Sequence, residues 1–118
     1  MNKLKIIGLG NFGKRTSFDF SRDEIETFFS IFPFFLNNFN LEKTSFFFEE
    51  SHPLKALGSN EHTIDKEYSG IEHVENNQLD LDVVFLPKTI KVIIRHSPLM
   101  KNKIIDEIKK IATYSGFD

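Results

Sequence analysis

The sequence predicts an α+β protein in which two helices pack on one mainly antiparallel sheet, in the order ββαβββα. Two hairpin-like pairs of alternating segments predict the strands, one pair near the N-terminus and one before the last helix. Two segments with apolar residues at helical spacing, each preceded by residues typical of a helix start, predict the helices. The late hairpin argues against a doubly wound parallel fold, because that fold needs strict βαβ alternation.

The first two strands are expected over residues 3–9 and 16–20. Residues 3–9 are rich in Leu and Ile and contain Gly8 at their end, with Gly10 just beyond it. Residues 16–20 alternate between polar side chains and the two rings of Phe18 and Phe20. A short Gly/Asn turn separates the two segments, so they can pair as a hairpin.

A helix is predicted to begin after Ser21. The Ser21 hydroxyl can accept from a free backbone N–H, and Glu24 can reach back to the amide of the capping residue. Four apolar residues then share one face: Ile25, Phe28, Phe29 and Phe32. Pro33 has no N–H and disfavours helix at Phe32, so the helix is expected to end or kink there. Residues 34–40 then form an irregular connection rich in Phe.

A third strand is predicted at residues 44–50, where three consecutive Phe residues would place rings on both faces. Residues 51–78 show no sustained period and form the longest irregular stretch, of the kind that is usually functional or disordered. A short strand at residues 68–74 fits within it.

The late hairpin is predicted from residues 79–86 and 89–96, joined by Pro87 and Lys88. Ser97 and Pro98 then favour a helix start. The last helix presents one apolar face made of Ile104, Ile105, Ile108, Ile111 and Ala112. Gly116 lies just past its expected end.

Length and composition predict a single domain over residues 1–118. The absence of Cys excludes a disulfide framework, a thiolate metal site and a cysteine nucleophile. No run of 18 apolar residues is present, and the N-terminal apolar run is too short for a signal peptide. We therefore expect a soluble, cytoplasmic protein. The 14 Phe residues are expected mainly in the core, with some of Phe34, Phe35 and Phe39 in a patch for a partner.

Charge is segregated along the chain. Residues 49–82 contain nine acidic residues but only Lys55 and Lys66 as basic ones, which gives this segment a charge of −7 and leaves +5 for the rest. Within the segment, Asp80 and Asp82 share one face of the predicted strand at residues 79–86. An acidic block in an otherwise basic small protein points toward a positively charged partner. If no such partner exists, the same pattern describes a solvated surface.

Gly8, Gly10 and Gly13 match the spacing of a dinucleotide-binding loop after a hydrophobic strand. In such a loop the phosphates rest on the N-terminus of a helix that follows at once. Here the following residues alternate as a strand does and the predicted helix start comes only at Ser21, so a hairpin turn is the better interpretation. A phosphate or nucleic-acid site that uses Lys14 and Arg15 beside these glycines stays open as an alternative.

The four histidines, His52, His62, His73 and His96, lack the short spacing that places two metal ligands on one helix face. They are expected to be histidines on a polar loop surface, and no metal or cofactor is predicted. The carboxylate pairs Glu49/Glu50 and Asp80/Asp82 would serve acid–base chemistry only if buried and close together, so no catalytic residue is predicted.

A small, Cys-free α+β protein with a concentrated acidic surface between Glu49 and Asp82 resembles the bacterial immunity proteins of contact-dependent growth inhibition systems. The resemblance implies a non-enzymatic inhibitor that covers the active site of a cognate basic toxin, a nuclease, by mimicking its polyanionic substrate. Opposite charge would also speed the encounter. With a net charge of only −2, affinity would also need apolar anchors, for which Tyr68, Ile71 and Val74 are candidates. The predicted toxin-binding residues are Asp65, Glu67, Tyr68, Glu72, Glu75, Asp80 and Asp82. The alternative is a nucleotide- or phosphate-binding enzyme built on the Gly8–Gly10–Gly13 loop.

Overall fold

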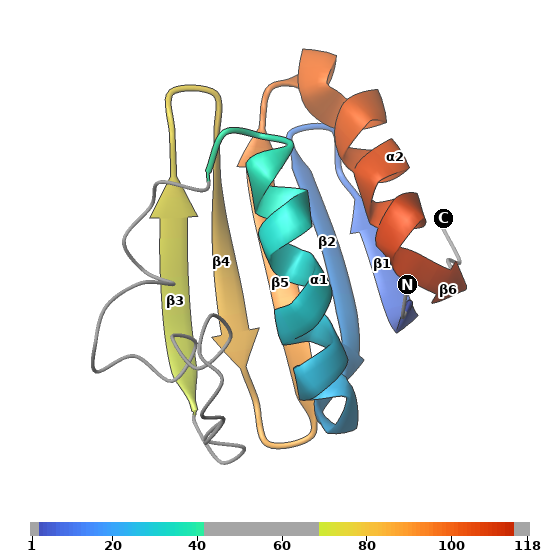
Figure 1. The fold of residues 1–118 in the computed structure, drawn as a ribbon. Coiled ribbons are helices and arrows are strands. Elements are labelled where there is room, and N and C mark those ends of the chain that lie inside the picture. The colour runs from blue at the N-terminus through green and yellow to red at the C-terminus, as the bar shows by residue number, and fades with distance from the viewer. Residues whose placement is uncertain (1–2, 42–68, 115–118) are drawn as a thin grey trace.

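The structure is a computed structural model that describes residues 3–41 and 69–114. The predicted α+β class and the order ββαβββα are confirmed (Figure 1). The elements are β1 (Leu4–Asn11), β2 (Arg15–Ser21), α1 (Ile25–Asn37), β3 (Gly70–Glu75), β4 (Leu79–Phe85), β5 (Thr89–His96), α2 (Lys101–Ile111) and a short β6 (Ala112–Tyr114). In this part of the chain, no helix is long and apolar enough to cross a membrane.

The strands form one six-stranded sheet in the order β3-β4-β5-β2-β1-β6. Both predicted hairpins are present, as the antiparallel pairs β1–β2 and β4–β5, and the pairing of β2 with β5 joins them into one sheet. Only β6 runs parallel to its neighbour, β1. Both helices lie on the same side of the sheet (Figure 1), so each strand has one face toward the helices and one face away from them.

The third strand of the order is β3 (Gly70–Glu75), where the sequence predicted a short strand at residues 68–74. The strand predicted at residues 44–50 lies outside the described residues. The sequence analysis placed Ala112 in the last helix, and this is wrong, because Ala112 has an extended backbone and begins β6. Its pairing with Leu4 at the edge of β1 provides backbone hydrogen bonds that local sequence preference could not reveal.

The start of the first helix follows the prediction in part. Ser21 Oγ accepts a hydrogen bond from the backbone N–H of Asp23 at 3.2 Å, and a short 3-10 turn over Arg22–Glu24 leads into α1. Glu24 does not return to the capping residue. Its Oε1 instead accepts from the backbone N–H of Lys5 at 3.1 Å, which ties the start of the helix to β1.

The expected end of the helix at Pro33 is wrong, because α1 continues to Asn37. A proline inside a helix costs one backbone hydrogen bond and some steric strain, roughly 3 kcal/mol. The residues beyond it, Phe35 and Leu36, lie on the same apolar face as Phe32 and are at most 2% exposed. Burial of such side chains contributes about 1.5–3 kcal/mol each, so continuing the helix outweighs the cost of Pro33, whose ring lies on the exposed side.

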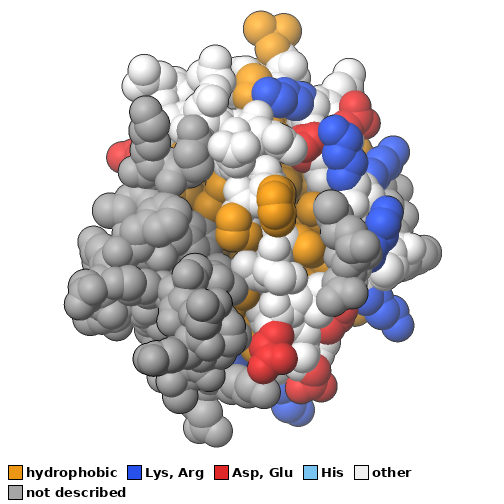
Figure 2. All heavy atoms as spheres, viewed as in Figure 1, with side chains coloured by type: hydrophobic (Ala, Val, Ile, Leu, Met, Phe, Trp, Pro, Cys, Tyr) orange, Lys and Arg blue, Asp and Glu red, His pale blue; other side chains and the backbone are white. Residues whose placement is uncertain are grey.

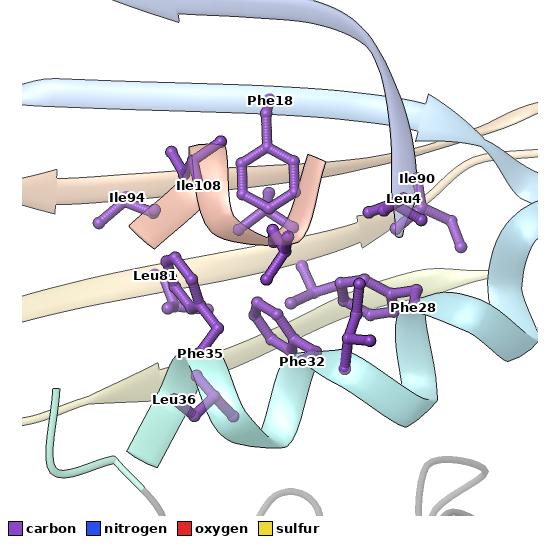
Figure 3. Packing of buried hydrophobic residues seen from close by; sticks show 14 of the residues in the cluster. Leu4, Phe18, Phe28, Phe32, Phe35, Leu36, Leu81, Ile90, Ile94 and Ile108 are labelled. Carbon is purple, nitrogen blue, oxygen red and sulfur yellow. The ribbon is translucent and has the colours of Figure 1, made fainter. Parts of the chain in front are cut away.

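Phe rings fill the core between the helices and the sheet (Figure 3). On α1, the ring of Phe32 stacks on those of Phe28 and Phe35, with centroid separations of 4.4 and 5.4 Å. Phe18 of β2 meets Phe35 edge to face at 6.4 Å. The expectation that the Phe residues are mainly core is therefore confirmed for the described ones, including Phe35 and Phe39. Phe12 and Phe34 are the exceptions among the described residues, since their side chains are 74% and 64% exposed.

Candidate functional site

The face of the sheet turned away from α1 and α2 carries most of the polar side chains of the strands. Residues directly opposite one another in a sheet point to the same side, so the register decides which side chains lie there. We call this side the open face. Its residues are Ile71, His73 and Glu75 of β3, Asp80, Asp82 and Val84 of β4, Lys91, Ile93 and Arg95 of β5, and Arg15, Ser17 and Asp19 of β2.

The opposite, helix-covered side has a different character. Figure 2 shows Lys and Arg side chains gathered over α2, beside an apolar patch over α1. On α2, Lys103 lies over the ring of Phe39 at 5.0 Å, and Lys110 Nζ donates to Glu107 Oε2 at 2.8 Å. This side therefore contributes to the basic remainder of the chain, and the described acidic strand residues lie mostly on the open face.

Arg95 holds two carboxylates in place on the open face. Its Nε donates to Asp80 Oδ1 at 2.6 Å and its Nη2 donates to Asp82 Oδ2 at 2.8 Å. The register explains this bridge, because Asp80 lies directly opposite Arg95 and Asp82 is two residues further along the same face. His73 lies opposite Asp82, with Nδ1 at 2.6 Å from Asp82 Oδ1, and its Nε2 is 3.5 Å from Glu75 Oε2.

These contacts shift three pKa values. The hydrogen bond to Asp82 raises the pKa of His73 above its ordinary value of 6.5. Partial burial by itself would raise the pKa of Asp82, but the hydrogen bonds from Arg95 and His73 outweigh it and hold the pKa below 3.8. The hydrogen bond to Asp82 also raises the pKa of Arg95. Asp82 is therefore charged at neutral pH, and its charge is shared between Arg95 and His73.

The structure brings together three of the predicted site residues, Glu75, Asp80 and Asp82, on two neighbouring strands of the open face. The placement of Glu72 beside them is wrong. Glu72 lies opposite Val83, on the side of the sheet that faces the helices. The reason is the two-residue period of a strand, which separates residues at odd spacing onto opposite faces.

The remaining predicted site residues, Asp65, Glu67 and Tyr68, lie outside the described residues. Of the apolar anchors, Ile71 is on the open face with 63% of its side chain exposed. Val74 is wrong as an anchor, because it is 1% exposed and packs in the core. Its position opposite Leu81 places it on the helix side.

The glycine motif forms a hairpin and not a dinucleotide-binding loop. Gly8 and Gly10 lie within β1, and Gly13 occupies the turn with φ +80°, a conformation that favours glycine. The chain then enters β2, so the helix needed to hold a pyrophosphate does not follow. A Cβ at Gly8 would lie 2.1 Å from Asp19 Oδ1, so a larger residue there would displace the Asp19 side chain.

The turn also has no spare amides for a phosphate. The backbone N–H of Phe12 donates to the Arg15 carbonyl at 2.8 Å, and that of Lys14 donates to the Phe12 carbonyl at 2.9 Å. The N–H of Gly13 donates to Asn11 Oδ1 at 3.1 Å. With these donors used inside the hairpin, the phosphate-binding alternative has no supporting geometry in the described residues.

His96 is buried, so its expected place on a polar loop surface is wrong. It ends β5 with 7% exposure, and Thr16, with 0% exposure, lies beside it. Asn11 Nδ2 donates to Thr16 Oγ1 at 2.6 Å, Thr16 Oγ1 lies 2.8 Å from His96 Nε2, and His96 Nδ1 lies 2.7 Å from the Ser97 carbonyl. A carbonyl only accepts, so Nδ1 carries the proton and Nε2 accepts from the Thr16 hydroxyl. This chain of hydrogen bonds lies at the edge of the core and links β1, β2 and β5.

Neither His73 nor His96, the described histidines, forms a metal site with the described carboxylates. His73 lies on β3 of the open face, while His52 and His62 lie outside the described residues. Over residues 3–41 and 69–114, no group of three or more His, Asp or Glu side chains could hold a metal ion.

Sequence reasoning missed Arg95, the residue that organises the carboxylates. A signal was present, because the predicted hairpin with its short Pro87–Lys88 connection implies a register in which residues 80 and 95 lie opposite each other. It also missed the pairing of Phe12 with Arg15, whose guanidinium lies 5.5 Å from the ring centroid. Arg15 and Arg95 both belong to strands whose pairing register follows from the length of a hairpin connection.

Comparison with known proteins adds no functional assignment. No protein-family model, no curated protein and no solved structure matches the chain. The functional argument therefore rests on the chemistry of the open face.

Proposed function

We propose that this protein is a non-enzymatic immunity protein of the bacterial cytoplasm, which binds a cognate basic toxin, a nuclease domain, and covers its active site. The observation that carries the proposal is the set of carboxylates of Glu75, Asp80 and Asp82, held on two adjacent strands of the sheet face that neither helix covers. The acidic residues Asp65 and Glu67, with Tyr68, extend the proposed contact surface along the chain.

The rigidity of the carboxylates supports a role in protein recognition. Arg95 fixes the side chains of Asp80 and Asp82 through two charge-assisted hydrogen bonds, so little side-chain entropy remains to be lost when a partner binds. A nuclease must carry Lys and Arg to hold phosphate. Carboxylates at fixed spacing can pair with such cations and steer the encounter.

Arg95 also limits where the partner can bind. It uses Oδ1 of Asp80 and Oδ2 of Asp82, and His73 uses Oδ1 of Asp82. The least engaged acceptors are Asp80 Oδ2 and the carboxylate of Glu75, whose side chain is 69% exposed. We therefore assign the contact with the toxin's cations to Glu75 and Asp80, and the positioning of Asp80 to Arg95.

The test uses the protein encoded directly upstream of the gene for this protein, which the proposal expects to carry the toxin domain. The two proteins are co-expressed and bacterial survival is scored, and inhibition of nuclease activity is then measured with purified components. The Glu75→Lys/Asp80→Lys double variant is expected to bind at least about tenfold more weakly. Asp106→Lys, on the exposed side of α2, is the matched control and should inhibit as well as the unchanged protein.

Two outcomes would contradict the proposal. One is an upstream gene whose product shows no toxicity or is not inhibited by this protein. The other is full inhibition by the double variant, which would move the toxin contact away from the open face.

A further inference from the structure

Along one row of the open face, the side chains change from negative to positive between β4 and β5. The register places four ionised side chains in one row across neighbouring strands: Glu75 on β3, Asp80 on β4, Arg95 on β5 and Arg15 on β2. The order across the sheet is negative, negative, positive, positive. The other charged residues of the face follow it in part, since Asp82 lies on β4 and Lys91 on β5, while Asp19 lies on β2.

Within the described part of the chain, the residues at the two ends of this row, Arg15 and Glu75, have the weakest contacts with opposite charges. Arg15 lies directly opposite Arg95, and like charges placed opposite one another in a sheet destabilise it. Arg95 is neutralised by Asp80 and Asp82, whereas Arg15 has only the ring of Phe12 beside it among the described residues. At the other end, Glu75 makes only a long contact of 3.5 Å with His73.

A second copy of the chain can place an opposite charge against both Arg15 and Glu75. A two-fold axis that runs parallel to the strands, between β4 and β5, turns one open face onto another and reverses the row. Glu75 of each copy then faces Arg15 of the other, and Asp80 faces Arg95. Such an isologous contact repeats each pair twice, and two sheets that pack face to face keep their strands nearly aligned.

Apolar side chains on the same face would be covered by this contact. Ile71 is 63% exposed, and Val84 and Ile93 are partly exposed beside it on β4 and β5. Phe12, which is 74% exposed, lies at the Arg15 end of the row, and its ring covers Gly10. The axis leaves β1 without a described strand opposite it, so the contact covers the four strands β3, β4, β5 and β2. Four strands of about seven residues span roughly 15 by 23 Å. Because such a footprint is small for a specific interface, the dimer should be weak and should depend on protein concentration.

We propose that the open face is the interface of a homodimer, with its two-fold axis parallel to the strands between β4 and β5. This inference goes beyond the proposed function and is tested on the protein alone. Since both use the same carboxylates, the second copy and the toxin would compete, and the dimer would be a storage form with a covered binding surface.

The test is sedimentation velocity of purified protein over a wide range of concentration. The unchanged protein should dimerise with rising concentration and dissociate with added salt. Glu75→Arg and Arg15→Glu should each weaken dimerisation roughly tenfold or more, because each places two like-charge contacts in the interface. Mixing the two variants should restore a dimer, since each introduced charge then faces its opposite and the unchanged Arg15 and Glu75 also meet.

Lys109→Glu on the exposed side of α2 is the control for net charge and should leave dimerisation unchanged. The chain has no Cys, so Ile93→Cys gives a second measurement. It lies beside the axis, on two sheets about 10 Å apart, which is too far for a disulfide but within reach of a short thiol-reactive crosslinker. A bismaleimide should therefore link two copies of Ile93→Cys, whereas it should not link Asn102→Cys on α2. An unchanged protein that stays monomeric at every concentration, or a mixture of the two folded charge variants that stays monomeric, would overturn the proposal. The result is independent of toxin inhibition, which is measured with the toxin present.

Discussion

The two faces of the sheet use the same strands for different purposes. On the helix side, alternate residues such as Phe18, Val92 and Leu81 are at most 1% exposed and belong to one apolar cluster. On the open face, most of their sequence neighbours are charged, and Arg95 contacts Asp80 and Asp82 across strands. Because side chains alternate between faces, a shift of one position along a strand moves a residue from the core to the open face, which we propose as the partner-binding surface. Matched pairs of neighbouring residues can test this contrast.

The largest expected effect lies in the core. Phe32→Ala removes a fully buried ring that stacks on two others, and should lower the free energy of unfolding by about 3–5 kcal/mol. Phe34→Ala, two residues away on the same helix but 64% exposed, should change it by less than about 0.5 kcal/mol. Urea denaturation followed by circular dichroism measures both. Equal effects of the two substitutions would contradict the assignment of the faces of α1.

The second comparison concerns neighbours on β2. Thr16→Val breaks the buried chain that joins Asn11 to His96 and leaves His96 Nε2 without its donor. It should cost about 1–3 kcal/mol of stability, because an unsatisfied polar group stays buried. Ser17→Val, on the open face, should change stability by about 0.5 kcal/mol or less. Denaturant unfolding of both variants is the measurement, and a neutral Thr16→Val would show that water replaces the lost bond.

A smaller effect is expected on the open face. Arg95→Gln removes the ion pairs to Asp80 and Asp82, and it should lower stability by about 1 kcal/mol or less because the groups are partly exposed. The same change adds net negative charge to the surface, so association with a basic toxin should become faster at low salt. Stopped-flow binding at several salt concentrations checks this. Slower association would mean that positioning of the carboxylates by Arg95 matters more than their net charge.

The smallest effect is the pH dependence of stability from His73. Its folded-state pKa is raised above 6.5, so its stabilising contribution is complete below pH 6.5 and is lost as pH rises through the folded-state pKa. Asp82 behaves oppositely, because its folded-state pKa is lowered. Its contribution is present above pH 3.8 and is lost as pH falls through the folded-state value. NMR titration of the His73 ring should show a pKa that falls toward 6.5 in Asp82→Asn, and an unchanged value would exclude the hydrogen bond as its cause.

Much of the fold followed from local patterns. The alternation in residues 79–96 and the short Pro87–Lys88 connection predicted the β4–β5 hairpin, because hairpin register and facing are set over a few residues. Ser21 marked the start of the first helical segment for a similar reason. The end of α1 was mispredicted because the local penalty of Pro33 was outweighed by burial of Phe35 and Leu36 against a sheet that lies elsewhere in the sequence.

The candidate site was predictable only in part. Asp80 and Asp82 were placed on one strand face from their spacing alone. The two-residue period of β3 separates Glu72 from Glu75, but the register of β3 with β4 was needed to show that Glu75 is the one that shares a face with Asp80. The burial of His96 depended on Thr16, which is 80 residues away along the chain. Contacts between distant segments are set by packing, and no local period encodes them.

Residue type and short-range spacing were enough to predict the charge segregation, the alternation of the strands and the apolar faces of both helices. The sheet topology was needed to show that Arg15 lies opposite Arg95, and that Arg15 and Glu75 lie at opposite ends of one row. This arrangement arises because β2 pairs with β5 in the middle of the sheet. That long-range pairing brings two hairpins together, so that the charges of both lie in a fixed order on one face of the sheet.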